Sequence, residues 1–292
     1  MSVLDINHVG KKFGDKVVLR DINLRLSENK IYGVLGRNGA GKSTLLNIMT
    51  NRIFPSNGKI TIDGEPVDNN DAQLSKMYLM SEINLYRDSD RLSKIIDDTE
   101  MLYGNIDREL VNDLATKFNL DLAQKFGKLS TGYRSIFKLI IAMSLPVEYV
   151  LLDEPVLGLD ANHRELFYSV LLESFSQRPR TFVISTHLIE EITNIISDVI
   201  VINQGEVVLN DSVENVTAKA VAVVGPTSAV DQYIMGLHVI GHENIGQLKA
   251  SYVFDELPDD RQIPDTVTIT PLDLQKLFIN LTDYTGGAKD EN

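Results

Sequence analysis

The stretch that decides the fold is residues 36–44, which read Gly36-Arg37-Asn38-Gly39-Ala40-Gly41-Lys42-Ser43-Thr44. They follow the pattern G-x-x-x-x-G-K-[ST] of a phosphate-binding loop. Glycines let the backbone fold so closely that successive N–H groups point at one anion. Lys42 can place a cation on the β- and γ-phosphates of a nucleotide, and the Ser43 hydroxyl is a hard oxygen ligand suited to Mg²⁺. We therefore predict a nucleotide site at this loop.

The flanking sequence supplies the context that this motif requires. Residues 31–35 form an apolar run typical of a buried strand, and the residues after the loop repeat at helical spacing. A helix that begins near Lys42 would aim its N-terminus at the phosphates. The order strand–loop–helix therefore favours a nucleotide site over a plain glycine-rich turn.

Composition limits the possible partners and the possible kinds of site. The 292 residues are 43% hydrophobic, enough for a large core and for one or two domains. There is no cysteine, which excludes disulfides and thiolate metal sites. Acidic residues outnumber basic ones by 41 to 28, and the net charge of −13 repels phosphate backbones. We therefore expect no nucleic-acid partner.

Two features bear on targeting and membranes. The sequence begins with a strand-like pattern over residues 1–5, so we expect no signal peptide. The longest apolar stretch, residues 136–147, contains Lys138, Ser144 and Pro146, and it is too short and too polar to span a bilayer. We expect a soluble chain.

The order of predicted elements indicates an α/β core. Strands are predicted at residues 2–8, 17–26, 30–35, 59–64, 77–80, 149–155, 181–185 and 199–202. Helices are predicted after the loop, at 163–175 and at 188–196. Alternating strands and helices favour a largely parallel sheet. Apolar residues at helical spacing predict a helical subdomain at about 84–145 within a first domain of residues 1–215.

The sequence past residue 215 has a different texture. Strands are predicted at 220–225, 248–254 and 267–269, and helices at 228–235 and 272–284. We interpret residues 216–292 as a small α+β domain whose tail, residues 286–292, is disordered.

Carboxylates stand where a buried strand ends. Residues 149–152 are apolar, as in strands buried on both faces, and Asp153 and Glu154 follow directly. In open α/β sheets, ligands bind at the carboxyl ends of strands. His187 follows the strand at 181–185 and should reach the same edge. The alternatives are a strand-ending turn for Asp-Glu-Pro and a structural role for a lone histidine, which is how we interpret His8, His163, His238 and His242.

With these motifs in order, residues 2–215 resemble the ATP-binding subunits of ABC transporters. GRNGAGKST resembles the family's Walker A motif, YVLLDEP its Walker B motif, LSTGY at 129–133 its signature, GLD at 158–160 its D-loop and STH at 185–187 its switch histidine. The resemblance implies a P-loop NTPase core of the ABC type that hydrolyses ATP with Mg²⁺. It makes Lys42, Glu154 and His187 catalytic, with Glu154 polarising the attacking water and His187 bonding that water or the γ-phosphate. It makes Ser43 and Asp153 magnesium ligands, and it places adenine on Phe13.

The signature suggests a second subunit. A serine before a helix, such as Ser130, is ordinarily just a cap. The resemblance implies more, since Ser130 and Gly132 would bind the γ-phosphate that a second ATPase subunit holds, either a copy of this chain or a close paralogue. Thr131 and Tyr133 depart from the family's glycine and glutamine, but we expect hydrolysis to survive.

A second departure lies at the family's Q-loop. The position of its glutamine, a magnesium ligand, falls by spacing at Ser81, and the neighbouring Glu82 could substitute for it. Both metal ligation and signalling to a membrane partner depend on which residue serves there.

The variant motifs and the α+β tail look most like ATPases of bacterial ABC-2 type exporters, whose cargo includes peptides and drugs. That resemblance implies a polytopic membrane permease as a separate chain, with this chain peripheral on the inner face of the cell membrane. Docking is expected at about 78–105, through Tyr78, Leu85, Tyr86 and Leu92, unless these side chains fill the core. The alternatives are a soluble ABC ATPase not coupled to transport, and a nucleotide-sensing module.

Overall fold

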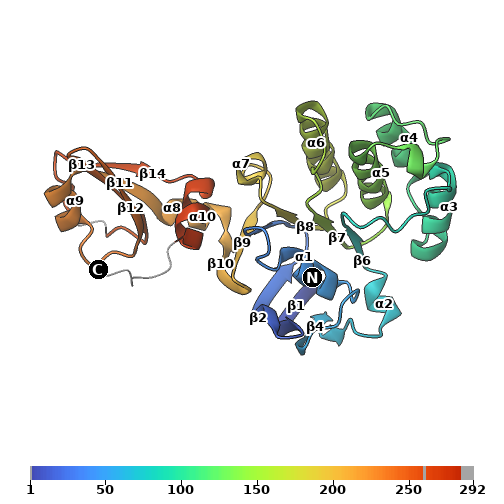
Figure 1. Ribbon diagram of the computed structural model, residues 1–292, viewed down its shortest axis with the longest axis horizontal. Coiled ribbons are helices and arrows are strands. Elements are labelled where there is room, and N and C mark those ends of the chain that lie inside the picture. The colour runs from blue at the N-terminus through green and yellow to red at the C-terminus, as the bar shows by residue number, and fades with distance from the viewer. Residues whose placement is uncertain (1, 259–260, 284–292) are drawn as a thin grey trace. The chain divides into compact units, whose positions relative to one another are not determined.

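The computed structural model describes residues 2–258 and 261–283 (Figure 1). The chain divides into two compact units. The first contains the residues up to His187 together with Ile202–Val207, and the second contains Leu188–Val201 and the residues from Val208 onward. The predicted disordered tail, 286–292, lies outside the described residues.

A parallel sheet forms the centre of the first unit. It contains β3 (Ile31–Leu35), β6 (Met77–Met80), β7 (Tyr149–Asp153) and β8 (Thr181–Thr186), and β8 pairs with both β3 and β7 while β6 pairs with β7. All residues of these four strands are buried, as expected for parallel strands that are covered on both faces. Within the first unit these strands follow one another in the order β3-β8-β7-β6. The strands β9 (Asp198–Asn203) and β10 (Glu206–Ser212) each have residues in both units.

A separate antiparallel sheet is formed by the N-terminal strands. Its order is β2-β1-β4-β5, with bounds Val3–Phe13 for β1, Lys16–Ser27 for β2, Asn57–Ile62 for β4 and Glu65–Pro66 for β5. Alternate side chains of β1 and β2, such as Leu4, Ile6 and Leu26, are buried. The sequence predicted most of these strands, but period-two alternation does not tell which sheet a strand joins.

The helices of the first unit follow the sequence pattern closely. They are α1 (Lys42–Met49), α2 (Asp71–Leu74), α3 (Leu92–Tyr103), α4 (Arg108–Lys117), a 3₁₀ turn (Phe126–Lys128), α5 (Thr131–Ser144) and α6 (Ala161–Gln177). Asp107, Ser130 and Asp160 cap α4, α5 and α6 by accepting backbone N–H groups. Phe118, Phe126 and Phe137 are buried, and the ring centres of Phe126 and Phe137 lie 6.2 Å apart.

The second unit is an α+β structure. Its antiparallel sheet has the order β12-β13-β11-β14, with β11 at Ala220–Pro226, β12 at Val239–Ile245, β13 at Leu248–Phe254 and β14 at Thr268–Pro271. Its helices are α7 (Ile189–Ile192), α8 (Val213–Lys219), α9 (Thr227–Tyr233) and α10 (Leu274–Asp283). Val223, Val230, Tyr233, Val253 and Val267 form its core.

Several elements differ from the sequence prediction. The helix predicted at 188–196 is the four-residue α7, since Thr193 and Asn194 are weak helix formers. β12 was missed because Gly241, His242 and Asn244 are unusual in strands, and pairing with β13 overrides that preference. β5, β10, α2 and α8 were also not predicted. The domain boundary at 215/216 stays a prediction, and it falls within α8.

Among the described helices, none combines the length and the apolar composition needed to cross a membrane.

Candidate nucleotide site

The phosphate-binding loop runs from the end of β3 to the start of α1. At two of its glycines a side chain would collide with neighbouring atoms. Gly41 has φ 111°, and a Cβ there would lie 2.5 Å from Cδ2 of Leu19. A Cβ on Gly36 would lie 2.7 Å from the carbonyl oxygen of Ile202. Neither position accepts a larger residue without moving its neighbours.

Lys42 connects the loop to the carboxylates at the end of β7. Its side chain is only 6% exposed, and Nζ donates a hydrogen bond to the Gly36 carbonyl at 2.7 Å. The same Nζ lies 3.6 Å from Oε1 of Glu154. A buried ammonium group so close to the loop is a ready partner for phosphate oxygens.

Asp153 is fixed by two hydroxyl groups. Ser43 Oγ donates to Oδ1 of Asp153 at 3.0 Å, and Ser185 Oγ donates to the same oxygen. The serine hydroxyl and the carboxylate are the hard oxygen donors that Mg²⁺ prefers, and Mg²⁺ commonly takes one or two such groups together with substrate phosphates. Residues 2–258 and 261–283 hold no cluster of three or more His, Cys, Asp or Glu side chains suited to a metal. The hydroxyl group of Ser43 and the carboxylate of Asp153 fit a magnesium ion shared with a nucleotide.

Glu154 has an unusual backbone conformation. Its φ of 47° lies in the left-handed region, and its N–H donates to the Ser185 carbonyl at 3.0 Å. Its carboxylate is largely buried, and Oε2 lies 2.9 Å from Nδ1 of His187. Left-handed backbone at a non-glycine residue is costly and concentrates at functional sites. The sequence does not reveal this strain.

Lys42, Ser43, Asp153 and Glu154 line a cavity of about 460 Å³, whereas His187 is not among its described lining residues. Of the described residues, those that line it are Lys16, Val18, Arg37, Asn38, Gly39, Gly41, Lys42, Ser43, Thr44, Asn47, Ser81, Glu82, Ile83, Asp153 and Glu154. The cavity thus collects most of the predicted loop with both carboxylates. Lys16, Val18 and Asn47 were not singled out from the sequence, since no motif contains them.

The family assignment comes from comparison with known proteins. The family model "ABC transporter" matches residues 19–157. These residues are an ABC transporter ATP-binding domain. The family match supports the predicted binding and hydrolysis of ATP. The predicted class of fold is confirmed.

Several individual proteins are similar to this chain in sequence or in fold. The ABC transporter ATP-binding protein YtrB of Bacillus subtilis is 26% identical over 65% of this chain, and the match spans 65% of YtrB, just under two thirds. The Nod factor export ATP-binding protein I of Burkholderia lata is 25% identical over 97% of each chain. A solved ATP-binding subunit of an ABC transporter shares the fold, with a TM-score of 0.67 at 20% identity over 73% of this chain and 91% of its own.

Phe13 stands apart from the lining residues of the ATPase domain's cavity. It ends β1, its side chain is 48% exposed, and Lys11 Nζ lies 4.9 Å from the centre of its ring. Lys16 and Val18, just across the hairpin on β2, line the cavity. Stacking of adenine on Phe13 stays a prediction.

Both candidates for the Q-loop role reach the cavity of the ATPase domain. Ser81 follows β6 and is buried, and its Oγ accepts a long hydrogen bond of 3.4 Å from Arg52 Nη1. Glu82 is exposed at the cavity wall. Either side chain can supply an oxygen ligand, so the choice between them stays open.

The signature residues lie at the start of α5. Ser130 accepts a hydrogen bond from the Tyr133 N–H at 3.3 Å, which is the capping role. A Cβ on Gly132 would lie 2.8 Å from the Gly158 carbonyl oxygen, so the signature packs closely on the D-loop. Neither Ser130 nor Gly132 is among the described residues that line the cavity. Their binding to a nucleotide held by a second subunit stays a prediction.

Proposed function

We propose that this chain is the ATP-hydrolysing subunit that powers export of a peptide, drug or similar substrate through a separate membrane subunit. The observation that carries the proposal is the Glu154 carboxylate, held between Lys42 and His187 at the wall of a cavity formed by the phosphate-binding loop. That arrangement suits hydrolysis of a phosphoanhydride by a positioned water.

Each group has a defined task in the proposed reaction. The loop N–H groups and Lys42 hold the β- and γ-phosphates, and Glu154 orients the attacking water for in-line displacement. His187 bonds Glu154 through Nδ1 and can present its other ring nitrogen to the γ-phosphate. Ser43 and Asp153 would hold Mg²⁺, with Ser81 or Glu82 as a further ligand. When bound, Mg²⁺ neutralises charge on the transferring phosphoryl group.

The proposed assembly contains two ATPase subunits. Ser130 and Gly132 lie away from the lining of the chain's own cavity, which supports a role toward the nucleotide of a second subunit. We propose a homodimer or a pair with a close paralogue, and no nucleic acid, because the net charge is −13.

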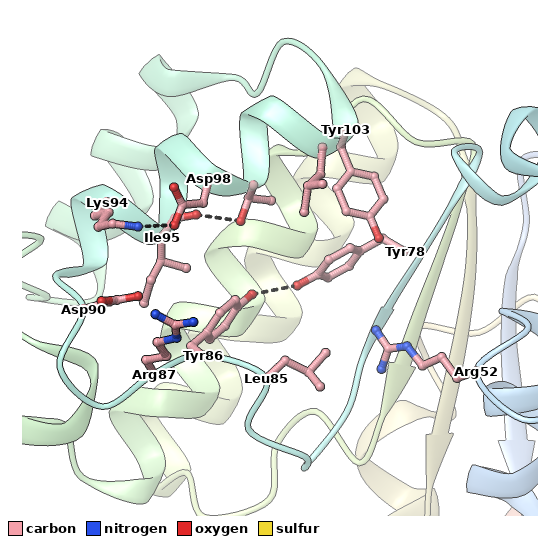
Figure 2. A pocket seen from close by; sticks show the side chains of 12 residues that line it. Arg52, Tyr78, Leu85, Tyr86, Arg87, Asp90, Lys94, Ile95, Asp98 and Tyr103 are labelled. Atoms are coloured by element: carbon pink, nitrogen blue, oxygen red, sulfur yellow. Dashed lines mark hydrogen bonds and ion pairs between the residues drawn. The ribbon is translucent and has the colours of Figure 1, made fainter.

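The proposed docking surface for the membrane subunit is a groove of about 480 Å³ in the first unit (Figure 2). Its described lining residues are Arg52, Tyr78, Leu85, Tyr86, Arg87, Asp90, Lys94, Ile95, Asp98, Thr99, Leu102 and Tyr103. The hydroxyl groups of Tyr78 and Tyr86 lie 3.1 Å apart. Burial raises the pKa of both phenols, so both stay protonated at neutral pH and one donates to the other.

Exposure separates the four predicted docking residues. Leu92 is fully buried and fills the core instead, whereas Tyr78, although only 8% exposed, and Tyr86 line the groove. Leu85 is 65% exposed and lines the groove, where Leu102 is also exposed. Exposed apolar side chains around a groove mark an interaction site. They support docking of a short apolar segment of the membrane subunit, with this chain peripheral on the inner face of the membrane.

Export, rather than import, is supported by the relative named for Nod factor export, which aligns over 97% of both chains. The substrate class rests on the resemblance to ABC-2 type exporters. The test is co-expression with the membrane protein encoded beside this gene, followed by measurement of ATPase activity and of transport into inside-out vesicles. We expect a detergent-stable complex and ATP-dependent uptake into these vesicles, which corresponds to export.

A matched pair of variants tests the docking groove. Leu85→Asp should abolish co-purification with the membrane protein while basal ATPase activity is kept. Leu172→Asp changes an exposed leucine on α6 and should leave the complex intact. An active ATPase that stays soluble beside its membrane neighbour would contradict the exporter proposal and favour an ABC ATPase not coupled to transport.

A further inference from the structure

A buried lysine on α5 is bonded to the loop that forms part of the nucleotide cavity. Lys138 is 6% exposed, and its Nζ donates to the carbonyl oxygens of Ser81 at 2.9 Å, Glu82 at 3.0 Å and Ile83 at 3.2 Å. An ammonium group has three N–H donors, so all three are used on three consecutive carbonyls. The carbonyl groups of residues 81–83 are thus all hydrogen-bonded to one nitrogen atom.

Burying the charged side chain of Lys138 costs free energy because the ammonium group loses its hydration. Burial lowers the pKa of Lys138, and the nearby charge of Arg134 acts in the same direction, while Glu82 opposes it. The neighbouring Phe137 and Leu139 are buried, so an apolar side chain would suit the surroundings of α5. The three carbonyl bonds are what offset the desolvation of the charge, and the role of Lys138 therefore lies in the loop rather than in core packing.

A second cation, Arg52, bonds Ser81 and the strand that precedes it. Arg52 Nη2 donates to the Leu79 carbonyl at 2.8 Å and Nη1 to Ser81 Oγ at 3.4 Å. Arg52 also lines the docking groove in Figure 2. Ser81 is thus bonded at its carbonyl by Lys138 and at its hydroxyl by Arg52.

The loop held in this way is part of the reaction site. Residues 81–83 line the nucleotide cavity together with Lys42, Ser43, Asp153 and Glu154. We propose that Lys138 is a positioning residue for ATP hydrolysis, because its ammonium group fixes the backbone at 81–83 and so sets the place of Ser81 and Glu82 at the phosphates. The inference rests on the proposed hydrolytic function of this site. It also connects α5, whose N-terminus carries the signature, to the cavity of the same chain.

The test compares two buried cations on carbonyl groups. Arg180 is 4% exposed and donates to the carbonyls of Met143 and Leu145, at the far end of α5 from the signature. Lys138→Met and Arg180→Met should both lower the melting temperature, because each leaves carbonyl groups without a donor. Only Lys138→Met should lower kcat, by about tenfold or more, because a small misplacement of reacting groups is expensive.

Affinity separates positioning from a general loss of structure. Binding of ATP to Lys138→Met should change by less than about threefold, since the loop N–H groups and Lys42 are untouched. If Lys138→Met does not fold, Lys138→Gln removes the charge but keeps one donor, and the same comparison applies.

A second readout does not depend on catalysis. The chain has no cysteine, and Ile83 is exposed, so Ile83→Cys accepts a single nitroxide label on the held loop. The label should become more mobile in Lys138→Met and stay unchanged in Arg180→Met. If the wild type is active and folded Lys138→Met keeps both its kcat and its label mobility, the positioning role of Lys138 is wrong. The proposed function of the chain is unaffected by that result. A wild type without ATPase activity would instead overturn the proposed function.

Discussion

His187 Nδ1 lies 2.9 Å from Oε2 of Glu154, while Lys42 Nζ lies 3.6 Å from the other oxygen of the same carboxylate. Three segments that are far apart in the chain therefore meet at one side chain. Each oxygen of Glu154 has a nitrogen partner, and the left-handed backbone of Glu154 fixes its direction. The carboxylate is thus held in one orientation at the cavity wall.

Glu154→Gln should keep ATP binding and slow hydrolysis by at least ~10²-fold, because an amide cannot act as the base that a carboxylate provides. Steady-state turnover and nucleotide affinity measure the two effects. Glu65→Gln, on exposed β5, is the matched control and should behave as wild type. Turnover of Glu154→Gln equal to wild type would rule out the assigned role.

Lys42→Ala should lose tight ATP binding, because a buried charge is removed from beside the phosphates, where charge-assisted contacts are strong. Titration calorimetry with ATP measures the affinity. Lys16→Ala also changes a lysine that lines the cavity, but the Lys16 side chain is exposed, so its loss should have a much smaller effect. A folded Lys42→Ala protein with unchanged affinity would contradict the assignment of the phosphate-binding loop.

His187→Ala should lower kcat by about tenfold or more while ATP affinity is kept, since the partner of Glu154 is lost but the loop contacts remain. The measurement is the separate determination of kcat and KM. His163→Ala is the control, because His163 also bonds a carboxylate, that of Asp160, at the start of α6. If both histidine variants hydrolyse ATP at the same rate, His187 has no special role.

We expect the protein to lose stability at alkaline pH because the phenol of Tyr149 is buried. Burial raises the pKa of Tyr149 to about 12, from the ordinary value of 10. The folded state therefore binds the phenolic proton more tightly, so its contribution is fully present below pH 10 and is lost as pH rises from about 10 to about 12. Urea unfolding at pH 8 and at pH about 11 should show a larger loss for the wild type than for Tyr149→Phe. Equal losses would contradict this cause.

The sequence alone predicted most of the residues that meet at the candidate nucleotide site. The loop at 36–44 and the carboxylates after residues 149–152 are contiguous patterns, and their backbone requirements are local. The position of His187 could also be predicted, because parallel strands place their carboxyl ends at one edge. The structure places all these groups together, as expected.

Tertiary structure decided what covers each apolar or charged side chain. The sequence predicted Leu85 and Leu92 alike as docking contacts, with filling of the core as the alternative for each. Only packing shows that Leu92 is buried and Leu85 is exposed. Lys138 interrupts an apolar run, and its partners lie 55 to 57 residues earlier in the chain. Periodicity describes one element at a time, whereas a hydrogen bond between distant segments depends on how the elements pack. For the same reason β12 forms against its own weak propensity, because pairing with β13 supplies what the local sequence lacks.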